Sequence, residues 1–195
     1  MTMTTQGNSR VSVLVLFPLL MLTACRDDVH RTWSEEARLS DGRTIVVHRT
    51  IEGKKGQEPG FPGAWLPTST SIDIPAAAAA GGVPPPPWRG SLVPVLLDYE
   101  QAQDTWRLIA TVPTCEEWTK LGRPEPPYLE YQSTGGQSWR QVPLEPQRIG
   151  QKTNLLPSPG TDETGRLIPL HEKEYQFLGL FNNYQQIVTR WNTSC

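Results

Sequence analysis

The sequence predicts a mainly β fold of the α+β class: an antiparallel sheet of hairpins, with one C-terminal helix packed on it. Three observations predict this class. Runs of β-prone residues flank turn-forming residues at three places along the chain. The 19 prolines favour turns and loops and argue against a helix bundle. Large apolar residues repeat at helical spacing near the C-terminus, which predicts the helix.

The first hairpin is predicted around the dipeptide Asp41-Gly42. It lies between residues 34–39 and 44–50, both of which are β-prone. Asp-Gly favours a two-residue turn, because both turn positions need a positive φ. Such a turn places Glu35 opposite His48, and we expect these two side chains to pair.

Two further hairpins follow. Residues 92–99 and 105–112 flank a polar turn, and residues 128–132 and 138–142 flank a turn that contains Gly-Gly. Alternation in the first of these hairpins predicts two apolar rows, Val93, Val95, Leu97 and Tyr99 on one strand and Trp106, Leu108, Ala110 and Val112 on the other.

Residues 52–90 differ in composition from the rest of the chain. They are rich in glycine, proline and alanine, which is typical of a low-complexity loop. Residues 65–74 are the one part of this segment that could hold a strand, since Ile72 and Ile74 alternate. We therefore expect a long loop at about 52–90.

The C-terminal region has a helical repeat. We expect a helix over Glu172–Arg190 that packs one face on the sheet. The residues of that face are Phe177, Phe181, Tyr184, Val188 and Trp191.

Residues 1–24 have the features of a signal peptide. A polar start with one basic residue, Arg10, precedes the apolar residues 11–24. This run is shorter than the roughly 20 residues that a membrane-spanning helix needs, and Pro18 interrupts it. We expect residues 1–24 to be removed on export.

The tetrapeptide Leu22-Thr23-Ala24-Cys25 resembles the lipobox of bacterial lipoproteins. The resemblance implies cleavage before Cys25 and attachment of diacylglycerol and a further acyl chain such as palmitate to that residue. Several acyl chains make a durable membrane tether. The alternative is an ordinary signal peptide that contains a cysteine.

The lipobox also implies a location and a domain organisation. In the enterobacterial sorting rule, aspartate directly after the lipidated cysteine retains a lipoprotein in the inner membrane. Here that residue is Arg26, which implies the outer membrane, with the protein facing the periplasm. We expect residues 25–31 to be a lipidated tether and residues 32–195 to form a single β-rich domain.

The body of the chain resembles a group of uncharacterised proteobacterial proteins over residues 94–156. The resemblance implies a shared fold and carries no activity with it. The residues that carry it are Leu97-Asp98-Tyr99, Val112-Pro113-Thr114-Cys115, Leu121-Gly122-Arg123-Pro124, Pro126-Pro127-Tyr128 and Asn154-Leu155-Leu156.

Two cysteines remain once Cys25 is assigned to lipid. In an oxidising compartment Cys115 and Cys195 are expected to form a disulfide that ties the C-terminus to the body. Two inert thiols or a bridge between molecules are the alternatives. Metal binding is not expected, because no histidine or cysteine neighbour has ligand spacing.

Composition and motifs exclude several classes of function. Without the leader the chain has 17 basic and 20 acidic residues and no basic cluster, which argues against nucleic acid as a partner. Motifs of hydrolases, nucleotide-binding loops and metalloproteases are absent from the sequence, and His30, His48 and His171 have no catalytic pattern around them. We expect no cofactor.

The sequence therefore favours a non-enzymatic envelope lipoprotein that contacts the membrane and other envelope components. One alternative is a glycan- or peptidoglycan-binding module that uses exposed loop aromatics, because exposed rings stack on sugars. The candidate rings are Trp65, Trp88, Trp118 and Tyr128. Another alternative is a hydrolase built on His48 or His171.

Overall fold

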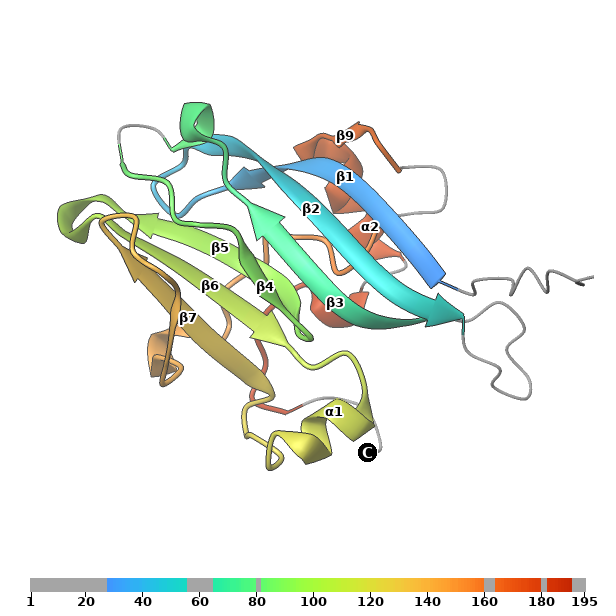
Figure 1. The fold of residues 1–195 in the computed structure, drawn as a ribbon. Helices are drawn as coiled ribbons and strands as arrows, with labels where there is room; N and C mark the ends of the chain where they lie inside the picture. Colours follow the sequence, from blue (N-terminus) through green and yellow to red (C-terminus); the bar gives the residue numbers. More distant parts are fainter. Residues whose placement is uncertain (1–27, 56–64, 80–81, 160–163, 180–181, 191–195) are drawn as a thin grey trace, which may run out of the picture.

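The fold was examined in a computed structural model that describes residues 28–55, 65–79, 82–159, 164–179 and 182–190 (Figure 1). Its strands and helices, in chain order, are β1 (Asp28–Arg38), β2 (Thr44–Lys55), β3 (Trp65–Asp73), β4 (Trp88–Gly90), β5 (Val93–Glu100), β6 (Thr105–Thr111), α1 (Cys115–Lys120), β7 (Tyr128–Thr134), β8 (Arg140–Val142), β9 (Leu167–Ile168) and α2 (Leu170–Leu178).

The strands form two sheets. Sheet A has the order β4-β3-β2-β1-β9, and sheet B has the order β5-β6-β7-β8. Neighbouring strands are antiparallel, except that β9 pairs in parallel with β1. The predicted class, mainly β (α+β) with antiparallel strands and a C-terminal helix, is confirmed, but the strands form two sheets where one was expected.

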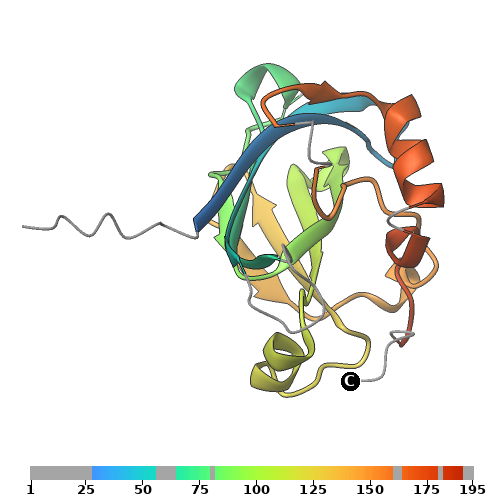
Figure 2. The ribbon, with the colours of Figure 1, turned by 90° about the vertical axis from the view of Figure 1, so that its right-hand side faces the viewer.

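The main core lies between the two sheets, which face each other in Figure 2. Sheet A contributes side chains such as Val47 and Ile72, and sheet B contributes Leu97, Trp106 and Leu108, all of them buried. Trp106 also donates its indole N–H to the Val83 carbonyl at 3.1 Å. A buried indole with a satisfied N–H contributes a large apolar area to the core at no polar penalty.

The first hairpin forms where it was predicted, but its register differs by one residue. The Leu39 amide donates to the Arg43 carbonyl, and the Gly42 amide donates to the Leu39 carbonyl, so the turn has three residues. Gly42 has the positive φ of 88° that such a turn needs. Val47 is therefore opposite Glu35, and the predicted pairing of Glu35 with His48 is wrong.

That shift decides which side chains are buried, because successive residues of a strand point to opposite faces. Glu35 and Arg49 lie on the buried face of sheet A, whereas His48 lies on its exposed face. The hairpin thus places two charged residues in the interior.

Most of the described part of 52–90 is not a loop. β2 continues to Lys55, and β3 lies inside sheet A between β2 and β4. The strand that residues 65–74 could hold is confirmed: Ile72 and Trp88 bury their side chains in the core, while Ser69 and Ser71 occupy the opposite face of β3. Residues 56–64 and 80–81 lie outside the described residues, so the expectation for them remains a prediction.

A bulge in β5 splits the predicted apolar row of that strand. The pairing with β6 shifts between Pro94 and Leu96, and proline cannot donate to the ladder. Val93 and Val95 consequently join a second cluster, on the outer face of sheet B, while Leu97 and Tyr99 face the main core. The predicted row on β6 is confirmed.

The C-terminal helix is shorter than predicted. α2 ends at Leu178, and Gly179 follows with φ −107° and ψ −96°, outside the helical region. Phe177 packs beside Trp33 and Ile168, whereas Tyr184 packs on sheet B, so the repeat does not form one helical face. The prediction of a helix over 172–190 is wrong; Phe181 and Trp191 lie outside the described residues.

Strand β1 also begins earlier than expected. Residues 28–31, assigned to the tether, are the first residues of β1, and His30 is an exposed residue within it. Only Arg26 and Asp27 separate Cys25 from this strand in the sequence.

Candidate functional site

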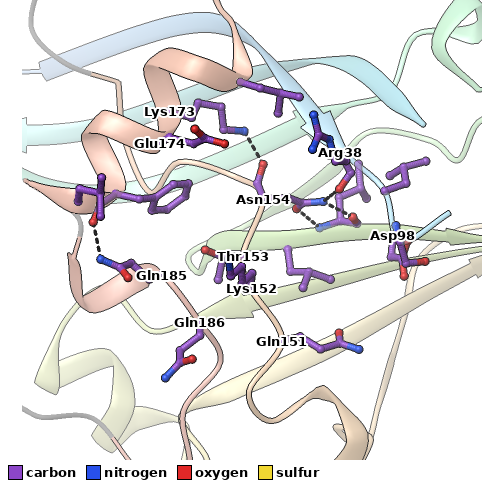
Figure 3. A pocket seen from close by; sticks show the side chains of 17 residues that line it. Arg38, Asp98, Gln151, Lys152, Thr153, Asn154, Lys173, Glu174, Gln185 and Gln186 are labelled. Carbon is purple, nitrogen blue, oxygen red and sulfur yellow. Dashed lines mark hydrogen bonds between the residues drawn. The ribbon is translucent and has the colours of Figure 1, made fainter. Parts of the chain in front are cut away.

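A groove of about 720 Å³ lies where four segments of the chain meet (Figure 3). These segments are the β1–β2 turn at 38–40, residues 96–98 of β5, residues 151–154, and α2. Gln185 and Gln186 complete the wall. Its volume falls in the range of small-molecule and short-peptide sites. Within the described residues, this groove is the strongest candidate for a binding site.

Asn154 holds the middle of the groove together. Its amide oxygen accepts from the Leu97 amide at 2.8 Å, and its Nδ2 donates to the carbonyls of Leu97 at 2.7 Å and Arg38 at 2.8 Å. The Asn154 side chain therefore pairs with the amide and the carbonyl of Leu97, as the backbone of a neighbouring strand would, and it also reaches the β1–β2 turn. The backbone amides of Asn154 and Leu155 both donate to the Val95 carbonyl.

Asp98 makes a second link at the same place. Its Oδ1 accepts from the backbone amide of Ser40 at 2.9 Å and from that of Tyr99 at 3.0 Å. β5 is the edge strand of sheet B. Because Asn154, Leu155 and Asp98 engage its edge groups, this edge is closed to pairing with another strand at residues 95–99.

The floor of the groove contains a buried ammonium group, that of Lys173. It forms an ion pair with Glu35 at 2.5 Å and donates to the carbonyls of Glu36, at 2.7 Å, and Asn154. Burial lowers the pKa of Lys173, and the Glu35 carboxylate opposes that shift. All three donors of the ammonium have acceptors, so Lys173 joins α2 to β1 and to residue 154 rather than offering a free amine.

Glu35 is the centre of this buried cluster. Oε1 accepts from Arg49 at 2.7 Å and from the Trp33 indole at 3.3 Å, while Oε2 accepts from the Leu156 amide at 2.9 Å. Burial lowers the pKa of Arg49, and the same carboxylate opposes the shift. One carboxylate thus forms ion pairs with two buried cations and fixes β1, β2, α2 and residues 154–156 relative to each other.

Three other charged side chains around the groove are exposed. They are Arg38 on the β1–β2 turn, Lys152 in the centre and Glu174 on α2 (Figure 3). Within the described ranges none of them has an ion-pair partner. They are the charges that the groove can offer to a ligand.

A separate ion network lies on the outer face of sheet B. Arg107 contacts Glu100, Glu130 and Glu145 at 2.9–3.0 Å. Arg148 lies 3.3 Å from Glu145. The described residues contain no group of three metal-binding side chains. These carboxylates are paired with Arg107 and Arg148, and the pairs hold residues 143–149 on the sheet.

The aromatic residues proposed to contact a ligand do not form a platform. Trp88 is 4% exposed and packs edge-on against Tyr131, and Tyr128 is 6% exposed in the outer cluster. Trp118 is half-buried and donates to the Pro124 carbonyl. The ligand role is therefore wrong for Trp88 and Tyr128, which fill the core. The side chain of Trp65 lies outside the described residues.

None of the three histidines lines the groove. His48 Nδ1 is 2.8 Å from Ser34 Oγ, on the exposed face of sheet A, and Asp73 is opposite His48 in the register. In the described part of the chain no hydrogen bond joins His48 to Asp73. His171 is exposed at the start of α2. Neither histidine combines a carboxylate, a serine and a cavity.

Cys115 is the first residue of α1 and is disulfide-bonded. Thr114 caps this helix by accepting the Glu117 amide at 3.2 Å. The spacing of threonine and glutamate is a helix-start signal that the sequence analysis missed. Cys25 and Cys195 lie outside the described residues, so the Cys115–Cys195 pairing and lipid on Cys25 remain predictions.

The pairing of Cys115 with Cys195 has a direct chemical test. Protein isolated without reductant is expected to show no alkylatable thiol after unfolding, and reduction is expected to release two. Peptide mass mapping should then find the 115 and 195 peptides joined. Two thiols that react with iodoacetamide before reduction would exclude the bridge.

Within the described ranges, no helix combines the length and hydropathy that crossing a bilayer requires. Comparisons of the chain with protein-family models, with curated proteins and with solved structures found no match.

Proposed function

We propose that this chain is a lipid-anchored envelope protein whose two-sheet body is a non-enzymatic interaction module. The observation that carries the proposal is the lipobox Leu22-Thr23-Ala24-Cys25, which stands three residues before the first residue of β1, Asp28. Three residues of chain reach at most about 11 Å. Lipid on Cys25 would hold the start of β1 close to the membrane surface.

The direction of β1 supports a role in binding. Asp28 lies at one end of the strand, and Arg38, at the other end, lines the groove. Ten residues of extended strand span up to about 33 Å. Figure 2 shows the start of β1 on the side of the molecule opposite α2. An anchor at Cys25 would therefore leave the groove on the membrane-distal side, facing other envelope components.

Two features weigh against the alternative functions. Burial of Trp88 and Tyr128 removes two of the rings on which a glycan-binding module would depend. The Ser34–His48 pair lies on an exposed sheet face rather than in a cavity. Because residue 26 is arginine, we place the anchor in the outer membrane, on its periplasmic side.

The test is replacement of Cys25 by serine in cells fed an alkyne-tagged fatty acid. Wild-type protein should carry the label and sediment with outer membranes, because only a thiol forms the thioether. C25S should lose the label and accumulate as uncleaved precursor.

The matched control is Cys115→Ser, which should keep the label. Processing and localisation of C25S like those of wild type, with no label lost, would show that the chain is not a lipoprotein.

A further inference from the structure

The exposed charges of the groove are unequal in sign. Arg38 and Lys152 are cationic and Glu174 is anionic, and none has an ion-pair partner within the described ranges. The other two ionised residues that line it are mostly buried and have charged partners: Lys173 pairs with Glu35, and Asp98 lies 4.0 Å from Arg148 and also accepts from the Ser40 amide. The groove therefore presents two cations to one anion.

Figure 3 shows how these charges are arranged. Glu174 lies at the α2 end, Arg38 and Asp98 lie toward the opposite end, and Lys152 lies between them. Among the exposed charges, Arg38 and Lys152 favour a negative group and Glu174 disfavours one. A ligand with one carboxylate would be oriented by this arrangement.

The walls add two kinds of contact. One wall is apolar and includes Leu170, Phe177 and Leu178, of which Leu178 is 75% exposed. Gln185 and Gln186 add amides to the lining; Gln185 Nε2 donates to the Phe177 carbonyl at 2.9 Å. Amide side chains both donate and accept, so they match the N–H and C=O groups of a peptide.

These observations disfavour other ligand classes. An acyl chain needs an enclosed apolar cavity, whereas this groove is open and has an amide-lined wall. A glycan favours stacking on exposed rings, and Phe177 is the one aromatic residue in the lining. Addition of a strand to β5 at residues 95–99 is prevented by Asn154 and Asp98.

We propose that the groove binds a short peptide that presents a carboxylate to Arg38 and Lys152 and an apolar side chain to the Phe177–Leu178 wall. This inference names the class of partner for the interaction module proposed above. It rests on that proposal only in taking the groove to be a binding site. Lipidation is not needed for it. A charge-assisted hydrogen bond strengthens binding by about tenfold, and less where water screens it.

The experiment uses the full mature protein, purified in detergent and immobilised. Two peptide pools serve as probes. The first contains random tetrapeptides with free carboxyl ends. In the second pool the carboxyl ends are amidated, and asparagine and glutamine replace all acidic residues. Retained peptides are identified by mass spectrometry. The proposal expects retention of acidic peptides that contain leucine, valine or phenylalanine, and much weaker retention from the amidated pool.

Charge variants then assign the site. Arg38→Gln and Lys152→Gln should each weaken binding of a retained peptide about three- to tenfold. Glu174→Gln should leave the affinity for the peptide unchanged or raise it, because it removes a negative charge that repels the peptide carboxylate. The matched control is Arg89→Gln, which removes an exposed cation on β4, away from the groove, and should change nothing.

Retention of no peptide, equal retention of both pools, or equal effects of R38Q and R89Q would overturn the proposal. Circular dichroism of each variant separates loss of binding from loss of fold. Because acyl labelling of Cys25 is measured independently, failure of peptide binding and failure of lipidation are distinguishable.

Discussion

Glu35→Gln is expected to lower the free energy of unfolding by about 3–5 kcal/mol, the range found when one partner of a buried ion pair is removed. Glutamine has the shape of glutamate but no charge. The substitution leaves the charges of Arg49 and Lys173 buried without an anionic partner, because in the wild-type protein both pair with the Glu35 carboxylate at 2.5–2.7 Å. The measurement is urea denaturation followed by tryptophan fluorescence.

The control for this substitution is Glu52→Gln, which makes the same chemical change at an exposed position of β2. It should change stability by less than about 0.5 kcal/mol. The double variant Glu35→Gln with Lys173→Met should lose less unfolding free energy than the two single variants lose together. The reason is that Lys173→Met removes a charge that Glu35→Gln leaves unpaired. A loss below about 1 kcal/mol for Glu35→Gln would show that the cluster does not hold the fold.

Asn154→Ala is expected to lower the free energy of unfolding by about 2–4 kcal/mol, since it removes the side-chain partner of three backbone groups, two of which are part-buried. These groups are the amide and carbonyl of Leu97 and the carbonyl of Arg38. Opening the β5 edge should also promote self-association, because unpaired edges pair with other chains. Denaturation and analytical ultracentrifugation measure the two effects.

Asn154→Asp separates the hydrogen bonds of the side chain from its volume. Aspartate can still accept from the Leu97 amide but cannot donate to the two carbonyls, and its charge repels them. We expect it to be at least as destabilising as alanine. Gln151→Ala is the control within the same groove, since among the described residues the side chain of Gln151 makes one hydrogen bond, at 3.4 Å to Arg148. Wild-type stability of Asn154→Asp would contradict the bonding described for this residue.

The hairpins were predictable because their signals are local. Asp41-Gly42 marked the first turn, but the sequence could not say whether the turn has two residues or three. This difference of one residue in turn length decides whether His48 or Val47 lies opposite Glu35 in the register. The buried cluster therefore could not be predicted, although Glu35 and Arg49 stand in β-prone runs and Lys173 stands in the segment predicted to be helical.

β3 and α2 show two further limits. β3 forms within residues 65–74, where the sequence allowed a strand, but the glycine- and proline-rich residues around it gave no sign that this strand lies inside a sheet. The repeat from Phe177 to Val188 matched a helix in spacing. Its members instead pack in two different clusters once Gly179 ends α2.

The groove could not be predicted because it has no local pattern. Its walls come from the β1–β2 turn, β5, residues 151–154 and α2, which are distant in the sequence. Asn154 stood out in the sequence only as part of the triplet Asn154-Leu155-Leu156. Its role depends on β5 being an edge strand, which is a property of the sheet and not of the triplet.

If Cys25 anchors this body to a membrane, as we propose, the mass of the mature N-terminal peptide will show it. Protein extracted from membranes and digested should yield a peptide that begins at Cys25 and carries the added mass of diacylglycerol and one further acyl chain. An unmodified Cys25, or a mature chain that begins at another residue, would contradict the account.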